Sequence, residues 1–191
     1  RTSHYDDTHC LSIRTQHPYM TQYIADIEHY TEVIARIPKA KRLLWIATAD
    51  LKDLYVKKSN QAVVPLLHIL NDLVKKGVEV RLIHAKEPGQ AFREDFDKYP
   101  ALWTGLERRL CPRVHMKIIS IDSEYVYIGS ANLTGAGMGM KSDHRRNFEA
   151  GIWTDEPGLI DSAMSHFDSI WEGNHCHACD RKAFCGDRIK E

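Results

Sequence analysis

Two basic side chains of different kinds lie two positions apart in the stretch His115-Met116-Lys117. Successive side chains of a β-strand point to opposite faces, so His115 and Lys117 are expected to emerge together while Met116 faces the other way. Burying an imidazole and an amine side by side without partners is energetically costly. The pair therefore predicts an accessible functional site rather than a piece of the core.

Neutral polar groups follow at the end of the next expected strand, where the sequence reads Gly129-Ser130-Ala131-Asn132. Glycine allows close approach of the backbone, and the side chains of Ser130 and Asn132 offer hydrogen bonds. One cation, two polar side chains and backbone N–H groups together suit an anion. The imidazole of His115 would then be available to attack it.

The spacing HxK(x)4D(x)6GSxN, which runs from His115 through Asp122 to Asn132, resembles that of the phospholipase D superfamily. Six specified residues at roughly 5% usage each match by chance on the order of 10⁻⁸ times per starting position, so the signal is specific. The resemblance covers about residues 19–172, and its specific part is confined to 114–149. It implies an α/β fold, with a mixed β-sheet flanked by helices in an α/β/α sandwich, and phosphodiester chemistry that needs no metal.

The resemblance also implies a catalytic role for four of the matched residues. His115 is expected to be the nucleophile, which forms a covalent phosphohistidine and releases an alcohol. Lys117 and Asn132, helped by Ser130, would hold the non-bridging phosphate oxygens as negative charge develops on them.

By the same resemblance Glu149 is the fourth of these catalytic residues, Ser130 binds the substrate phosphate, and two further positions are structural. Asp122 matches a motif aspartate that is more structural than catalytic, and Gly129 belongs to the phosphate-binding turn. Glu149 lies where family members place a carboxylate behind the histidine, where it would fix the tautomer through Nδ1.

The family mechanism uses two histidines, a nucleophile and a general acid, whereas this chain has one complete motif. His84-Ala85-Lys86 repeats only its first letters, so His84 is interpreted as a residue at the end of a strand. The second His115 is therefore expected from a second copy of the chain, in an isologous homodimer. Single-motif members of the superfamily are typically small nucleases or phosphodiesterases.

Nucleic acid is the expected substrate, because the loop at 141–146 carries three cations and a histidine near the proposed phosphate site. The formal net charge is zero, with 26 Lys and Arg against 26 Asp and Glu, which excludes a protein that coats nucleic acid by bulk charge. Trp103 and Trp153 could offer stacking surfaces for bases, although an aromatic side chain is more often part of the core. Two alternatives stay open: hydrolysis or transfer of phospholipid head groups, and a catalytically idle nucleic-acid-binding module.

The elements that would position these residues follow from hydrophobic periodicity. We expect an arm at 1–17, a catalytic domain at 18–172 and a tail at 173–191. Within the domain we expect helices at 19–37, 61–76 and 156–171, one or two short helices within 88–107, and strands at 42–49, 78–84, 107–111, 114–122, 124–130 and 147–154. The strand, helix and strand between 42 and 84 predict a right-handed crossover and a parallel pair.

The tail concentrates thiols at Cys176, Cys179 and Cys185, and Cys-x2-Cys places two sulfur atoms around one ion. The fourth ligand is open among Cys10, His9, His175 and His177. With Cys10 the site would hold a structural zinc or, as an alternative, an iron–sulfur cluster, remote from hydrolysis. Free thiols or a disulfide are the competing interpretation, and Cys111 is assigned to the core.

No apolar stretch approaches the roughly 18 residues that a membrane span needs, so we expect no membrane association. An odd number of cysteines without a regular framework is poor evidence for a secreted disulfide scaffold. The expected location is cytoplasmic.

Overall fold

A computed structural model of the protein describes residues 18–52, 54–58 and 62–186. Its centre is a seven-stranded sheet in the spatial order β1-β9-β8-β7-β2-β5-β6. The strands are β1 (Thr21–Ala25), β2 (Leu43–Thr48), β5 (Glu79–His84), β6 (Leu106–Leu110), β7 (Lys117–Ile121), β8 (Tyr125–Gly129) and β9 (Ala150–Thr154). β2, β5 and β6 are parallel and the other neighbours are antiparallel, so the expected mixed sheet is confirmed.

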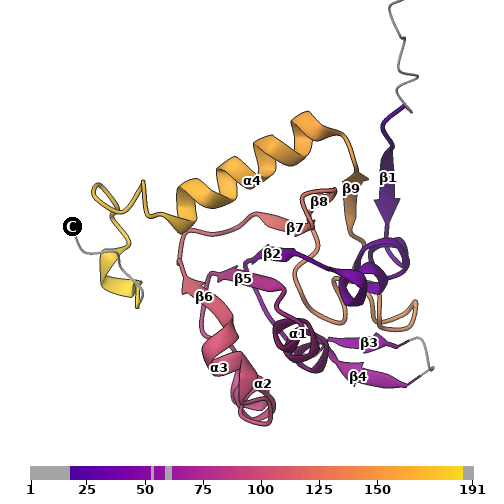
Figure 1. Ribbon diagram of the computed structural model, residues 1–191, viewed down its shortest axis with the longest axis horizontal. Coiled ribbons are helices and arrows are strands. Elements are labelled where there is room, and N and C mark those ends of the chain that lie inside the picture. The colour runs from indigo at the N-terminus through magenta and orange to yellow at the C-terminus, as the bar shows by residue number, and fades with distance from the viewer. Residues whose placement is uncertain (1–17, 53, 59–61, 187–191) are drawn as a thin grey trace, which may run out of the picture.

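Helices cover both faces of this sheet (Figure 1). One face carries α1 (Leu66–Lys75), α2 (Gln90–Phe96), α3 (Ala101–Gly105) and the 3₁₀ helix η2 (Ile34–Lys39), around the larger hydrophobic core. The other face is crossed by α4 (Pro157–Trp171), which packs a second core that includes Trp45, Ile118 and Phe167. The predicted α/β/α sandwich is therefore confirmed.

The parallel pair β2 and β5 forms because both strands are buried on both faces. Leu44 lies opposite Val80, and the register continues to Thr48 opposite His84. The connection runs through α1, and the chain turns at Gly77, whose φ of 81° is in the left-handed region that glycine adopts without strain. The prediction of a crossover between residues 42 and 84 is confirmed.

The helix expected at 19–37 is wrong in its first half. Residues Thr21–Ala25 form β1, which pairs antiparallel with β9 at the edge of the sheet. The chain then turns at Asp26, whose φ is 46°, and continues as a π-helical turn, η1 (His29–Val33), and η2. The apolar residues here are spaced as in a helix, but pairing with a strand far along the chain outweighs that local pattern.

The helix expected at 61–76 is too long at its start. Val63–Pro65 forms β4, which pairs antiparallel with β3 (Tyr55–Lys57), and α1 begins only after Pro65. Proline lacks the N–H that a helix interior requires, so the helix starts at the next residue. A last short helix, η3 (Lys182–Phe184), lies in the tail.

Two expected strands also start late, which affects the site. β7 begins at Lys117 and β9 at Ala150, so His115 and Glu149 both lie just outside the sheet. Trp153 is fully buried as expected, whereas Trp103 is exposed and touches the edge of Phe96. Among the described residues, no helix is both long and apolar enough to cross a bilayer.

Candidate active site at one edge of the central sheet

The directions of the strands bring the motif residues to the same strand ends, along one edge of the central sheet. β7 starts at this edge and β8 ends there, with Lys117 opposite Gly129 in the register. β9 starts there too, with Gly151 opposite Gly129. The carboxyl ends of β2 and β5 reach the same edge, because β2 runs antiparallel to β7. Residues distant in the sequence thus converge on one place.

The central pair is His115 and Lys117. The Lys117 ammonium donates to the Nδ1 atom of His115 at 3.1 Å and to its carbonyl oxygen at 2.6 Å, and it lies 3.4 Å from Nε2. His115 is exposed, whereas only 6% of Lys117 is exposed. Burial lowers the pKa of Lys117, and the negative charge of Glu149 opposes that shift. The structure therefore joins the two groups that their spacing had paired.

Asn132 is held in an orientation that suits an anion. Its Oδ1 accepts hydrogen bonds from the backbone N–H of Asp50 at 3.1 Å and from the Thr48 hydroxyl at 3.5 Å. A backbone N–H needs an acceptor, which assigns the oxygen to this side and leaves Nδ2 as the donor of the amide.

Ser130 and Glu149 contact each other. The Ser130 hydroxyl donates to Oε2 of Glu149 at 2.5 Å, and Oγ accepts from the backbone N–H of Ala150 at 3.1 Å. Asn147 Nδ2 donates to Oε1 of Glu149 at 3.0 Å. No hydrogen bond joins Glu149 to His115 within the described part of the chain. The phosphate contact expected of Ser130 and the tautomer role expected of Glu149 therefore stay predictions.

Asp122 lies at the opposite end of β7 from Lys117. Its carboxylate accepts from the backbone N–H groups of Lys41, Arg42 and Leu43 at 3.0, 2.7 and 3.1 Å, and so holds the chain as it enters β2. Backbone donors bound to a carboxylate are among the stronger hydrogen bonds in proteins. This environment agrees with a structural role.

Gly129 leaves room for a tyrosine that the sequence had not singled out. A Cβ atom at this position would lie 2.3 Å from the hydroxyl oxygen of Tyr127 and 2.7 Å from the carbonyl oxygen of Ala150. The Tyr127 hydroxyl accepts from the backbone N–H of Ala131 at 3.1 Å. Burial raises the pKa of Tyr127, so it stays neutral. Tyr127 thus fixes the backbone between Ser130 and Asn132.

The sequence analysis missed a charged cluster beside Asn132. Asp50 binds Lys52 at 3.1 Å and Lys86 at 3.3 Å, and both lysine side chains are largely exposed. Burial alone would raise the pKa of Asp50, but hydrogen bonds from these two lysines outweigh it and lower the pKa. The available signal was the position of Asp50 and Lys86 just beyond the carboxyl ends of two parallel strands, where ligand-binding residues concentrate.

The basic loop at 141–146 partly neutralises itself. Arg146 forms an ion pair with Asp143, and Arg145 Nε donates to the Ser142 hydroxyl at 3.5 Å. Its contact with a polyanion stays a prediction. His84 is buried, with Nδ1 2.7 Å from the carbonyl oxygen of Lys86, and so it lies at the end of β5 as interpreted.

The cysteine prediction falls partly outside the described residues, because Cys10 and His9 lie there. Cys176, Cys179 and Cys185 line one cavity together with His175. Among the described residues, no three His, Cys, Asp or Glu side chains are close enough to hold an ion as they stand. A hydrogen bond from the backbone N–H of Arg181, and then Arg113, lowers the pKa of the Cys179 thiol.

Comparison with known proteins gives matches over most of the chain. A family model described as "Cardiolipin synthase, PLD-like domain" matches residues 33–171. Cardiolipin synthase of Clostridium perfringens is 25% identical over 137 residues, which are 66% of this chain and 26% of that protein. The chain thus spans about a quarter of the length of the curated relatives that it matches.

Solved structures give the same fold. NucT from Helicobacter pylori has a TM-score of 0.60 at 17% identity, over 81% of this chain and 97% of that one. Nuc from Salmonella typhimurium, a phospholipase D family member, scores 0.59 at 20% identity, over 81% and 95%. The archaeal chromatin protein TrmBL2 scores 0.54 at 16% identity, over 84% and 55%. The family model includes every motif residue from His115 to Glu149, and this chain therefore belongs to the phospholipase D-like family.

Proposed function

We propose that the protein is a metal-independent nuclease that cleaves DNA or RNA through a phosphohistidine, in an active site shared by two copies. The observation that carries this proposal is the exposed His115 imidazole with the Lys117 ammonium 3.1 Å from it. The amide of Asn132 is fixed at the same sheet edge. A nucleophile beside a cation and a neutral donor is what displacement at a phosphodiester requires.

The first step forms one bond and breaks one. The lone pair of His115 Nε2 attacks phosphorus, and the bond from phosphorus to the leaving oxygen breaks. That oxygen takes a proton from the imidazolium of the second subunit. In the second step a water oxygen attacks phosphorus, its proton returns to the second imidazole, and the phosphorus–nitrogen bond breaks. Lys117 and Asn132 would stabilise the charge on the non-bridging oxygens in both steps.

The Lys117 ammonium lies within hydrogen-bond distance of both ring nitrogens of His115, 3.1 Å from Nδ1 and 3.4 Å from Nε2. An attacking Nε2 needs a free lone pair, so the neutral ring that reacts carries its proton on Nδ1. We expect the phosphate oxygens to draw the ammonium away from the ring. Glu149, whose charge already acts on Lys117, is the nearby carboxylate suited to accept from Nδ1.

The surface beside the site supports a dimer. Phe148, next to Glu149, is 93% exposed, and Tyr23 and Ile152 are 69% and 39% exposed. Tyr23 and Ile152 lie opposite each other on β1 and β9, near the edge where the motif lies. Apolar side chains gathered on one surface are typical of interaction sites. A second copy docked here would bring its own His115 towards the first.

Nucleic acid is favoured as substrate by local charge. Asp50, whose N–H donates to Asn132, forms ion pairs with Lys52 and Lys86. These two lysines add positive charge near the site to that of the basic loop. One structural neighbour, TrmBL2, is titled as showing a novel mode of DNA binding. Phospholipid head groups are the alternative, which the likeness to cardiolipin synthases favours. The exposed apolar surface with Phe148 would then be the place for lipid contact.

The test is incubation of the purified chain, and of His115→Asn, with labelled single- and double-stranded DNA and RNA in the presence of a chelator. Cleavage by the unaltered protein alone is expected. Vesicles that contain phosphatidylglycerol and cardiolipin are the parallel arm. Hydrolysis or transfer of the vesicle phospholipids without cleavage of nucleic acid would contradict the proposal that the protein is a nuclease. Circular dichroism before and after chelation distinguishes loss of chemistry from loss of fold.

A further inference from the structure

The tail cavity has a fourth cysteine that the sequence did not place there. Cys111 lines the same cavity as Cys176, Cys179 and Cys185, and the cavity has a volume of about 320 Å³. The expectation that Cys111 belongs to the core is only partly right, because it is half-buried and faces this space. The cavity lies between the C-terminal end of α4 and the loop that leads from β6 to β7.

Two contacts bring the tail against this loop. The Cys185 thiol donates to the carbonyl oxygen of Leu110 at 3.6 Å, next to Cys111. The pKa of the Cys179 thiol is lowered first by the backbone N–H of Arg181 and then by the nearby side chain of Arg113, two residues after Cys111. In Figure 1 the tail, drawn in yellow, turns back beyond the end of α4 to lie beside β6. The tail cysteines therefore lie beside the segment that contains Cys111 and line one cavity with it.

The backbone of the tail turns at each of its cysteines. The N–H of Cys179 donates to the carbonyl oxygen of Cys176 at 3.2 Å, which closes a turn between the two thiols. Cys185 directly follows η3, and its N–H donates to the carbonyl oxygen of Lys182 at 3.2 Å. Short turns of this kind place two or three sulfur atoms around one point.

We infer that Cys111, Cys176, Cys179 and Cys185 bind one structural zinc ion. Each thiol would release its proton to solvent, and four thiolates would surround the ion tetrahedrally at about 2.3 Å. Since the sulfur atoms are not yet gathered at such distances, binding requires rotation of the cysteine side chains and tightening of the tail. Metal binding in small sites is commonly coupled to folding in this way.

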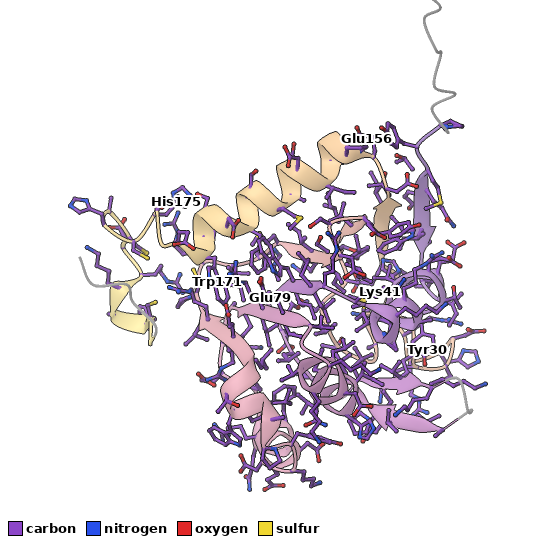
Figure 2. The ribbon with its side chains drawn as sticks, viewed as in Figure 1. Tyr30, Lys41, Glu79, Glu156, Trp171 and His175 are labelled. Atoms are coloured by element: carbon purple, nitrogen blue, oxygen red, sulfur yellow. The ribbon has the colours of Figure 1, made fainter. Side chains whose placement is uncertain are left out.

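His175 is not one of the ligands in this proposal. Its Nε2 is hydrogen-bonded to the hydroxyl of Ser169 on α4 at 3.1 Å. Figure 2 shows His175 close to the end of α4, where that helix joins the tail. Four thiolates complete a tetrahedral site without it. A tetrahedral set of four thiolates around one ion is a common structural zinc site.

The position of Cys111 gives the ion a role for the active site. Cys111 lies four residues before His115, in the loop that carries the nucleophile to the start of β7. At one end of this loop the Cys111 N–H donates to the carbonyl oxygen of His84 at 2.9 Å. The loop then turns where the Val114 N–H donates to the carbonyl oxygen of Cys111 at 2.9 Å. A bound zinc would fix both the tail and this loop, and would position His115 without touching substrate.

The test measures metal rather than activity. The full chain is purified after expression with added zinc, and its metal content is determined by mass spectrometry. We expect about one zinc ion per chain. After replacement by cobalt, the visible spectrum should be that of tetrahedral cobalt bound by four thiolates. Cys111→Ser should lose the ion, whereas Cys10→Ser, the matched control, should keep it.

A ligand-preserving variant guards against simple misfolding. Cys111→His should retain the ion but change the cobalt spectrum to that of three thiolates and one nitrogen. Full zinc content with an unchanged cobalt spectrum in Cys111→Ser would overturn the inference. So would loss of zinc from Cys10→Ser, a brown iron–sulfur spectrum, or unaltered protein that holds no metal. None of these readouts depends on whether the protein is a nuclease.

Discussion

The contact between His115 and Lys117 places a basic side chain in a largely buried position. Only 6% of the Lys117 residue is exposed, and burial lowers the pKa of its ammonium because it disfavours the charge. The negative charge of Glu149 offsets only part of this cost. A phosphodiester would supply the missing negative charge, so the site is prepared for an anion.

Replacement of Lys117 should separate activity from stability. Lys117→Met keeps the length of the side chain and removes the buried charge. We expect nuclease activity to fall at least about 100-fold, because the charge on the phosphate oxygens is no longer balanced. The free energy of unfolding, measured in urea, should rise. Lys98→Met, at an exposed lysine, should change neither the activity nor the free energy of unfolding. A Lys117→Met variant that is less stable than the unaltered protein would show that burial of the Lys117 charge is not destabilising.

Asp50 should make stability depend on pH in the acid range. Its pKa is lowered in the folded protein, because Lys52 and Lys86 outweigh the effect of burial. A lowered folded pKa adds stability above the unfolded value of about 3.9, and this stability is lost as pH falls through the folded pKa. Asp50→Asn should therefore unfold at lower urea concentration than the unaltered protein at pH 6, and the difference should shrink at about pH 2. Asp161→Asn, at an exposed carboxylate of α4, should show no such difference.

At the scale of elements, the sequence predicts best where burial is complete. β2, β5, β8 and α4 were predictable because their apolar patterns reflect cores on one or both sides of the sheet. β1 was not, since its partner β9 lies far along the chain and Asp26 adopts a left-handed turn that no local pattern announces. The helix predicted for the first half of 19–37 therefore failed, because the strand there depends on a partner that the local pattern does not reveal.

The same reason explains which parts of the site could be predicted. His115, Lys117, Ser130 and Asn132 could be proposed from the sequence because a short spacing carries them. Thr48, Asp50 and Lys86 were missed because they join the site only through the order of the strands. Cys111 was missed as a neighbour of the tail because that contact depends on where α4 ends relative to β6.

Gly129 tests how the strands hold the phosphate-binding turn. In Gly129→Ala the added Cβ would meet the hydroxyl oxygen of Tyr127 at 2.3 Å and a backbone oxygen at 2.7 Å. We expect a loss of about 1–3 kcal/mol in the free energy of unfolding, together with weaker catalysis as the turn with Ser130 and Asn132 shifts. Measurement is by urea denaturation and by cleavage rate.

A second substitution identifies the cause of that loss. Tyr127→Phe removes the hydroxyl oxygen at 2.3 Å but keeps the ring carbon Cζ, which lies 2.6 Å from the added Cβ. The double variant Gly129→Ala with Tyr127→Phe should therefore regain only part of the stability lost in Gly129→Ala alone. It should not regain full activity, because the hydrogen bond that the Ala131 N–H donates to the Tyr127 hydroxyl is lost as well. Unaltered stability and activity in Gly129→Ala would show that the turn tolerates a Cβ.

At the scale of the whole molecule, a site shared by two subunits makes a quantitative prediction. If both copies of His115 are required, one substituted subunit inactivates the dimer. When equal amounts of unaltered and His115→Asn chains are unfolded together and refolded, about one quarter of the dimers should retain both histidines. Activity per total chain should then fall with the square of the unaltered fraction. Proportional loss, to about one half at equal mixing, would mean that each chain acts alone.

The surface proposed for the dimer can be tested with one substitution and a control. Phe148→Asp, on the exposed surface beside Glu149, should give monomers that keep their fold and lose cleavage. Trp103→Asp, at an exposed residue on α3, should leave both the dimer and its activity intact.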